Sequence, residues 1–295
     1  MRHGWNLPKP SVMNKGLFLF VSLIFIFGFL FSFLFYLPQK GLLVDFCDVG
    51  QGDATLIQSP SGFQVLIDGG PDEKVLSCLS SVMPPWDKSI NLVILTHPHA
   101  DHLRGLLEVL KRYQVDQILS TDAVHTSPEF LEWLSLIREK KIPFYTSQKV
   151  KGIDLEEGWI EVLFPKESFK DKSVKNLNNT SVVLRLEYQG VGFLFLGDLE
   201  EEGQMKLLKE KTDLEPVVFL KVPHHGSKAA LNEAFLKKIQ PKVAIISVGQ
   251  NSYGHPDSKT IEKLERQGIV VKRTDWEGTI EVEVDPKGVW KMKPN

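Results

Sequence analysis

A cluster of metal-ligand side chains follows an apolar run, and it constrains the fold more than any other feature of the sequence. The run Leu92–Leu95 predicts a buried strand, and His97-Pro-His99-Ala-Asp101-His102 comes directly after Thr96. Imidazole and carboxylate groups are the ligands that zinc, manganese and iron accept in proteins. A polar turn with hydrogen-bonded histidines is the alternative interpretation, but the later motifs favour a metal site at a strand end.

Three further polar motifs also follow predicted strands. Gly197-Asp198 comes after an apolar run, and its carboxylate either bridges two ions or caps the next helix. His224-His225-Gly226-Ser227 follows another run, and paired histidines before a glycine rarely serve packing. His255 lies in a third such loop, as a further ligand, a substrate contact or a cap for the helix at 257. Layered α/β folds place ligands at strand ends, so these motifs predict one site.

Two aspartates are predicted to support that site. Asp68 ends the run Phe63–Ile67, where a carboxylate can accept the second ring proton of a ligating histidine and fix its tautomer. Asp53 is assigned the same supporting role from the glycine-rich turn 48–54, which by itself predicts either a phosphate cradle or a hairpin. The polar run 176–181 supplies amides and hydroxyls near the predicted site.

Charge and cysteine usage narrow the function classes. The 295 residues carry a formal net charge of −2, which argues against a dedicated duplex-binding module and leaves a metal-centred nuclease open. Cys47 and Cys78 are too far apart for a CxxC pair, so a thiolate metal site or a redox motif is not indicated. A single disulfide between them stays open.

The segment Gly16–Tyr36 contains no charged residue and predicts one transmembrane helix. Arg2, Lys9 and Lys15 precede it, so the positive-inside bias places a short tail, residues 1–15, in the cytoplasm and the remainder outside the cell membrane. A cleaved signal peptide is the competing interpretation, but no small-residue cleavage site follows the apolar run. We therefore predict a single-pass anchor, residues 16–36, and one folded domain, residues 41–295.

The alternation of apolar runs and helical periodicity predicts a mixed α/β domain with two sheets and helices outside them. The expected strands are 42–47, 54–58, 63–67, 92–95, 159–164, 181–187, 192–196, 217–222, 243–247 and 279–284. The expected helices are 103–112, 128–141, 200–211, 232–239 and 257–267.

Together these motifs resemble the metallo-β-lactamase superfamily: HxHxDH at 97–102, Gly-Asp at 197–198, a late histidine and an early Ile-Asp-Gly-Gly at 67–70. More narrowly, Asp-Val-Gly-Gln-Gly-Asp at 48–53, Asn-Asn-Thr-Ser at 178–181, Pro-His-His-Gly-Ser at 223–227 and Tyr-Gly-His-Pro at 253–256 are similar to the soluble hydrolase domain of ComEC-type competence proteins. The resemblance covers about residues 42 to 285, but the chain has one apolar span, so a DNA-uptake pore does not follow from it.

The resemblance implies a four-layered αββα sandwich with two divalent metal ions at one edge of the sheets, zinc first and manganese as the alternative. His97, His99 and His224 would hold one ion. Asp101, His102 and His255 would hold the other, with Asp198 between the two ions. The choice of His224 over His225 is the weaker step of this assignment. Many members carry another histidine between the first motif and Gly-Asp, where this chain offers His125 and then asparagines.

Two divalent ions would activate a shared water for attack on a phosphodiester. Asp101 and Asp198 are the expected catalytic carboxylates, and His225 is the expected proton donor to the leaving oxygen, with His255 as the alternative. Asn178, Ser181 and Ser227 are expected to contact the substrate phosphate. The predicted function is a membrane-anchored phosphodiesterase or nuclease acting on single-stranded DNA or on RNA, and no protein partner is implied.

Two other functions stay open. The same metal pair could hydrolyse a small ester, such as a phosphorylcholine ester, a lactone or a β-lactam. The chain could also be a non-catalytic, membrane-tethered binding module that keeps the fold. The complete HxHxDH and Gly-Asp motifs count against this second alternative.

Overall fold

The computed structural model describes residues 1, 15–35, 41–210 and 212–294. The chain divides into two compact units, Met1–Pro38 and Gln39–Asn295, and each is described by itself. The first unit contains helix α1 (Lys15–Phe35), which overlaps the segment predicted as a membrane anchor, residues 16–36. Among the residues that the structure describes, no helix is long and apolar enough to cross a membrane. Most of the predicted cytoplasmic tail lies outside the described residues.

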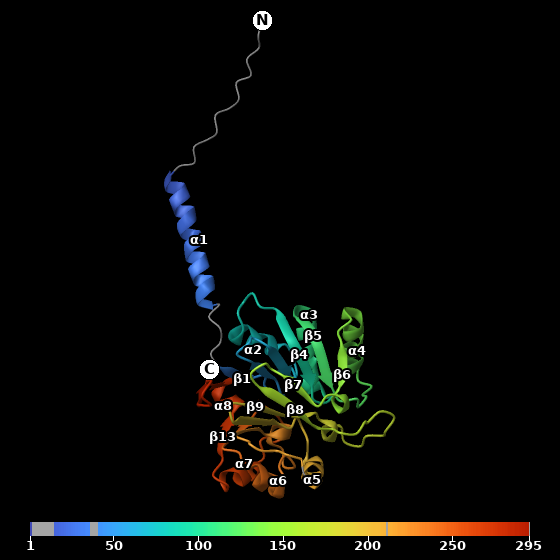
Figure 1. The fold of residues 1–295 in the computed structure, drawn as a ribbon. Coiled ribbons are helices and arrows are strands. Elements are labelled where there is room, and N and C mark those ends of the chain that lie inside the picture. Colours follow the sequence, from blue (N-terminus) through green and yellow to red (C-terminus); the bar gives the residue numbers. More distant parts are fainter. Residues whose placement is uncertain (2–14, 36–40, 211, 295) are drawn as a thin grey trace. The chain divides into compact units, whose positions relative to one another are not determined.

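Two β-sheets form the centre of the second unit (Figure 1). The first sheet has eight strands in the order β15 (Trp290–Pro294), β14 (Ile280–Val284), β1 (Leu42–Phe46), β2 (Thr55–Gln58), β3 (Gln64–Ile67), β4 (Ser89–Leu95), β5 (Gln114–Ser120) and β6 (Phe144–Thr146). The second has seven in the order β13 (Val270–Arg273), β12 (Val243–Ile246), β11 (Phe219–Lys221), β10 (Val191–Phe195), β9 (Val183–Tyr188), β8 (Trp159–Phe164) and β7 (Gly152–Asp154).

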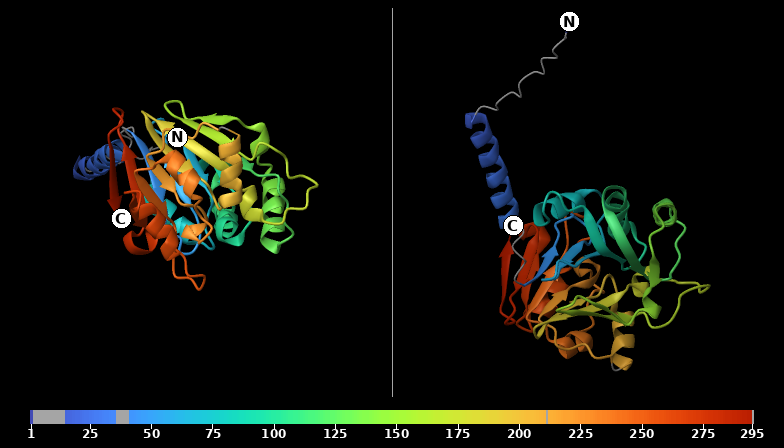
Figure 2. Two further views of the ribbon diagram at one scale, coloured as in Figure 1. Left: turned by 90° about the horizontal axis from the view of Figure 1, so that it is seen from below. Right: turned by 45° about the horizontal axis from the view of Figure 1, so that its top comes forward.

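Helices cover the outer face of each sheet (Figures 1 and 2). The helices on the first sheet are α2 (Lys74–Val82), α3 (Ala100–Arg112) and α4 (Pro128–Lys140), whose buried side chains share one apolar cluster with that sheet. Those on the second are α5 (Glu201–Lys209), α6 (Glu233–Ile239) and α7 (Ser258–Glu265), which share another cluster. The short helix α8 (Thr274–Glu277) follows β13. The predicted two sheets flanked by helices are thereby confirmed.

A third apolar cluster lies between the two sheets. Leu42, Val44 and Phe46 alternate along β1 and contribute one face of it, as the period of a strand requires. The second sheet contributes stacked aromatic rings, among them Phe193 and Phe219, whose centroids are 4.7 Å apart. Because this core holds the sheets together, side chains at their common edge keep fixed mutual positions.

Parallel strands bring four of the predicted motifs to one edge of the sandwich. In the first sheet β3, β4, β5 and β6 run parallel, and in the second β10, β11, β12 and β13 do. The motifs follow the carboxyl ends of β4, β10, β11 and β12. The sheet topology therefore places these polar motifs at the ends of strands, as the sequence predicted.

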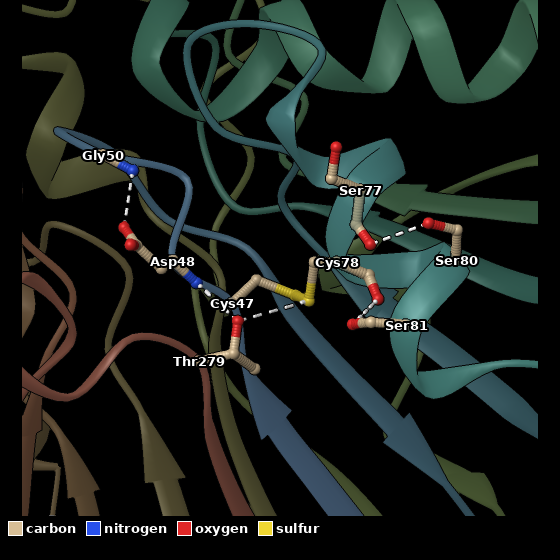
Figure 3. The surroundings of a disulfide bond; sticks show 8 residues. All are labelled: Cys47, Asp48, Gly50, Ser77, Cys78, Ser80, Ser81 and Thr279. Carbon is tan, nitrogen blue, oxygen red and sulfur yellow. Dashed lines mark hydrogen bonds between the residues drawn. A yellow bond between two sulfur atoms is a disulfide. The ribbon is translucent and has the colours of Figure 1, made fainter. Parts of the chain in front are cut away.

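Cys47 and Cys78 form a disulfide that joins the end of β1 to helix α2, with their Cα atoms 5.8 Å apart (Figure 3). The backbone N–H of Asp48 donates to Oγ1 of Thr279 at 3.1 Å, and the N–H of Gly50 donates to Oδ1 of Asp48 at 3.1 Å. These contacts hold the start of the glycine-rich loop 48–53 against the first sheet. Both cysteines are buried.

Candidate metal centre

Histidines and aspartates from both sheets converge at this edge. His97 and His99 come from the loop between β4 and α3, and Asp101 and His102 lie in the first turn of α3. Asp198 follows β10, and His225 lies in the short helix η3 (Pro223–Gly226) after β11. Their ligand atoms form two neighbouring groups, His97 with His99 and Asp198, and Asp101 with His102, Asp198 and His225.

Asp198 belongs to both groups. Its Oδ2 lies 3.6 Å from Nε2 of His97, and its Oδ1 lies 3.3 Å from Nε2 of His102. The carboxylate is 1% exposed, and its Oδ1 accepts the backbone N–H of His224 at 3.1 Å. The structure thus places Asp198 between the two histidines, in the position from which one carboxylate can reach two ions.

The tautomers of His97 and His102 follow from one buried carboxylate. Nδ1 of His102 donates to Oδ2 of Asp68 at 2.8 Å, and Oγ1 of Thr96 donates to the same oxygen at 2.8 Å. Since the Thr96 proton is used there, its oxygen accepts from Nδ1 of His97, 3.1 Å away. Nε2 of each ring is therefore left without a proton in the neutral form and points into the cluster.

His225 reaches the cluster because its backbone adopts a left-handed conformation. His224 and His225 have φ values of 49° and 51°, which non-glycine residues rarely adopt. Nδ1 of His225 donates to the carbonyl oxygen of Ser247 at 3.0 Å, and Nε2 lies 3.1 Å from Oδ2 of Asp101. Asp53 lies behind the ring, with Oδ1 3.3 Å from Nδ1. Asp53 and Asp68 thus each contact a histidine on the side away from the cluster.

The electrostatics of the cluster reflect burial and an excess of carboxylates. Burial lowers the pKa of His97 well below its ordinary value. Burial also disfavours charge on His225, but the carboxylates of Asp53 and Asp198 outweigh it and raise its pKa to about 10. The pKa of His102 is raised well above its ordinary value in the same way, with Asp198 and Asp68 overcoming the effect of burial. The site therefore attracts positive charge.

These residues fit divalent metal ions. Nε2 of His102 is buried and makes no hydrogen bond among the described residues, although Asp198 lies near it. Nε2 of His97 and Nδ1 of His99 face each other at 3.0 Å, a contact that brings two potential ligand nitrogens to one place. Neutral imidazoles and ionised carboxylates are the donors that zinc and manganese accept. The clustered side chains are thus compatible with a dinuclear divalent metal site.

His224 lies beside the cluster in a separate set of polar contacts. Its Nδ1 is 3.3 Å from Oε1 of Glu200, 3.4 Å from Nδ2 of Asn178 and 3.2 Å from Oγ of Ser227. Neither His224 nor His255 shares a ligand group with the clustered residues, whereas His225 does. The geometry therefore favours His225 over His224 and His255 as the late histidine of the centre, and the roles predicted for the latter two stay predictions.

A solvent-open pocket of about 600 Å³ lies over the centre. Side chains from the glycine-rich loop, the start of α3, η3 and the loop after β12 line it: Gln51, Pro71, His99, Ala100, Asp101, Arg104, His224, His225, Gln250, Asn251, Ser252, Tyr253 and His255. Asn178, Ser181 and Ser227, the predicted phosphate contacts, are not among them. Ser181 is fully buried, and its Oγ accepts the backbone N–H of Asp198 at 3.1 Å.

Three contributors to the site were not recognised in the sequence. Thr96 relays the bond from Asp68 to His97, and Glu200 contacts both Asn178 and His224. Lys221 is 3% exposed and pairs with Asp53 at 2.7 Å. A lysine inside the apolar run Phe219–Val222 was the available signal, because a buried ammonium requires a partner.

Comparisons with known proteins identify the family of this chain. Residues 47–250 match the family described as the metallo-beta-lactamase superfamily. ComE operon protein 3 of Bacillus subtilis (strain 168) is 32% identical over 81% of this chain and 32% of its own length. Competence protein ComA of Neisseria gonorrhoeae is 26% identical over 87% of this chain and 36% of its own length. The chain thus spans about a third of these relatives, and the resemblance to ComEC-type competence proteins is confirmed.

Solved structures show the same fold. The metallo-beta-lactamase fold protein YhfI from Bacillus subtilis aligns with a TM-score of 0.55 and 15% identity, over 85% of this chain and 100% of that one. CmlA, a diiron beta-hydroxylase from Streptomyces venezuelae, aligns with a TM-score of 0.51 and 11% identity, over 84% of this chain and 54% of that one. The chain therefore belongs to the metallo-β-lactamase superfamily and has the fold of its metal-dependent hydrolases.

Proposed function

We propose that this chain is a dinuclear metal-dependent phosphodiesterase that cleaves single-stranded DNA or RNA. The observation that carries the proposal is the position of Asp198, which belongs to both ligand groups. Other members of these groups, His99, Asp101 and His225, line an open pocket. His97, His99 and Asp198 would hold one ion, and Asp101, His102, Asp198 and His225 the other. When bound, two such ions would activate water and neutralise charge on phosphorus.

The chain's own residues orient the donors. Asp68 and Thr96 fix the rings of His97 and His102, and Ser247 fixes that of His225, so each presents Nε2 to the centre. Donors held in this way require little rearrangement when a substrate binds. His224 is 27% exposed at the pocket beside Glu200, and it is the group we assign to proton delivery to the leaving oxygen. In this proposal His224 takes the place of His225, which we assign to the ligands because its Nε2 lies 3.1 Å from Oδ2 of Asp101.

Nucleic acid is supported as substrate by the relatives. One of them is named a competence protein, and Recombination protein 2 of Haemophilus influenzae, 26% identical over 94% of this chain and 33% of its own length, is named for recombination, a reaction of DNA. The net charge of −2 argues against tight binding of a long duplex, because that requires a cationic face. A short single-stranded segment, held mainly at the centre, fits both observations.

A small ester is the second candidate substrate. The pocket volume of about 600 Å³ lies within the range of small-molecule sites. A phosphorylcholine ester, a lactone or a β-lactam would occupy such a space. A β-lactam or a lactone differs from nucleic acid in the bond that is broken, and a phosphorylcholine ester differs from it in the groups esterified to phosphate. Assays on substrates of both kinds therefore separate these candidates from a nuclease.

The test uses the purified full chain with its metal content measured. Single-stranded DNA, bis-p-nitrophenyl phosphate, p-nitrophenyl phosphorylcholine and nitrocefin are offered with zinc or manganese. We expect cleavage of the DNA and of the diester, and its loss in Asp198→Asn. Asp213→Asn is the matched control, because the Asp213 side chain is 80% exposed and outside the site, and it should retain full activity. Cleavage of only a small ester would contradict the nuclease proposal and favour a small-ester hydrolase. Binding of two metal ions without cleavage of any substrate would indicate a non-catalytic binding module.

We also propose that the hydrolase domain lies outside the cell membrane, attached through residues 16–36. The uncharged apolar sequence supports attachment, and basic residues before it support a cytoplasmic N-terminus. The disulfide between Cys47 and Cys78 supports an oxidising compartment, where such bonds persist. Extraction of membranes with carbonate at high pH tests the attachment, since release of the protein would contradict it. Protection of the domain from protease added outside intact spheroplasts would contradict the orientation.

A further inference from the structure

Tyr253 stands at the pocket with its ring largely uncovered. It lies in the loop between β12 and α7, lines the pocket over the metal centre, and is 75% exposed. Its ring centroid is 5.7 Å from that of His255, at an interplanar angle of 32°. An aromatic ring that borders a site yet stays exposed offers a face to whatever enters. Among the described residues that line this pocket, Tyr253 is the only Phe, Tyr or Trp.

The loop that carries Tyr253 is held by the side chain of Asn251. Nδ2 of Asn251 donates to the carbonyl oxygens of Gly249 and His255, both at 2.8 Å. Oδ1 accepts the backbone N–H of Tyr253 at 3.1 Å and that of His255 at 3.0 Å. All four of these hydrogen bonds connect Asn251 to other residues of the same loop. The Tyr253 ring is therefore carried by a turn that is already formed before a ligand binds. Little ordering is then required when a ligand stacks on it.

We propose that Tyr253 is a stacking platform for a nucleobase and thereby selects a nucleotide beside the phosphate at the metal centre. This rests on the proposed phosphodiesterase function and names the part of the substrate that the pocket recognises. Stacking on an aromatic side chain tolerates every base, as a nuclease of broad sequence range requires. Such a contact also supplies affinity without a cationic face, in keeping with the net charge of −2.

The same pocket is poorly suited to a quaternary ammonium. Recognition of choline uses several aromatic rings that enclose the cation. Here Tyr253 stands alone among the benzenoid side chains of the described lining, and Arg104 adds a guanidinium to it. That guanidinium is paired with Glu129, so the choice of ligand depends on the single ring. One exposed ring can stack on a nucleobase but cannot enclose a quaternary ammonium, so a nucleobase is the better match for this pocket.

The experiment measures how much the base adds to binding. Thymidine 5′-monophosphate and 2-deoxyribose 5-phosphate share sugar and phosphate, and neither contains a phosphodiester. Calorimetric titration of the metal-loaded full chain should show that the nucleotide binds about 5- to 100-fold more tightly than the sugar phosphate. Tyr253→Leu should reduce this ratio to near one with little change for the sugar phosphate, and Tyr253→Phe should preserve it.

Trp276→Ala is the matched control, because Trp276 is 74% exposed but does not line the pocket. It should leave the ratio unchanged. On single-stranded DNA, Tyr253→Leu should raise KM and retain kcat. Equal binding of the two ligands to the wild type, no binding of either, or a ratio that survives Tyr253→Leu would overturn the inference. A base-dependent ratio in a chain that cleaves no phosphodiester would instead overturn the proposed function and leave nucleotide recognition standing.

Discussion

Nζ of Lys221 lies 2.7 Å from Oδ2 of Asp53, in an ion pair whose side chains are 3% and 6% exposed. Lys221 is on β11 of the second sheet, and Asp53 follows β1 of the first, so the pair joins the two sheets beside the metal centre. Burial raises the pKa of Asp53, but Lys221 and His225 outweigh it and lower the pKa to about 2. The carboxylate is therefore ionised and depends on this partner.

We expect Lys221→Met to lower the free energy of unfolding by about 3–5 kcal/mol, because it leaves a buried carboxylate without its ammonium partner. Urea unfolding measures the change. The double substitution Lys221→Met with Asp53→Asn should recover part of the loss. Lys237→Met is the control, since the Lys237 side chain is 65% exposed in its pair with Glu233, and it should change stability by less than about 0.5 kcal/mol. Wild-type stability of Lys221→Met would contradict the prediction.

Asp68→Asn should weaken metal binding by about 10- to 100-fold, because both oxygens of Asp68 accept hydrogen bonds and an amide retains only one acceptor. Oδ1 accepts the backbone N–H of Thr96, and Oδ2 accepts from the Thr96 hydroxyl and from His102. Competition with a chromophoric chelator measures the affinity, and circular dichroism checks that the fold is retained. Asp48→Asn serves as the control, since the Asp48 carboxylate accepts from the exposed Gly50 N–H. Unchanged affinity in Asp68→Asn would contradict the role of Asp68 in orienting the two rings.

Asp45 predicts a pH dependence of stability that is separate from the metal centre. Burial, with a contribution from Glu281, raises its pKa from 3.8 to about 7, and neither oxygen has a hydrogen-bond partner among the described residues. A raised pKa means that the folded state keeps the proton longer than the unfolded chain. The stability contributed by Asp45 is thus fully present below pH 3.8 and is lost as the pH rises through 7.

Asp45→Asn should therefore stabilise the protein at pH 8 relative to the wild type, by up to about 4 kcal/mol more than at pH 4. Urea unfolding of both proteins at the two pH values gives the difference directly. Asp213→Asn, which removes an exposed carboxylate, should show no such difference between the two pH values. An Asp45→Asn protein that follows the wild type at every pH would be incompatible with a buried, protonated Asp45.

Removal of the disulfide should destabilise the hydrolase domain by about 2–4 kcal/mol, because a bond across 31 positions restricts the unfolded chain. Guanidinium unfolding of Cys47→Ala with Cys78→Ala measures the loss. Wild-type protein treated with a reductant should unfold at the same midpoint as this double variant, and the reductant should leave the variant unchanged. Equal stability of the oxidised and reduced wild type would contradict the prediction.

The sequence predicted the elements whose side chains carry a clear apolar pattern. All ten expected strands and all five expected helices are present within a few residues of their expected bounds. Strand β5 was missed because Gln114, Asp116 and Gln117 interrupt its apolar residues, although it pairs with β4 along its length. Strands β6 and β7 have three residues each, too few for a period to show, and α2 was missed because serines dilute its apolar face.

Within the site, proximity was predictable and orientation was not. The motif at 97–102 and Asp198 follow buried strands, so their convergence could be inferred from topology. The choice between His224 and His225 depends on the left-handed backbone at these two residues, which turns the second ring toward Asp101. The residue types do not predict that turn, because even histidine adopts the left-handed backbone only in a small share of cases. The ion pair between Lys221 and Asp53 could not be predicted either, because it depends on how the two sheets lie against each other.

The residues of the metal centre are divided by the exposed connection 166–175, which separates β8 from Asn176. His97, His99, Asp101 and His102 precede this connection, whereas Asp198 and His225 follow it. A chain cut there would consist of two pieces, neither of which holds a complete set of ligands. Metal binding by the cut protein would then show whether the two pieces are still associated. The metal centre can thus be used to measure how completely the domain is assembled.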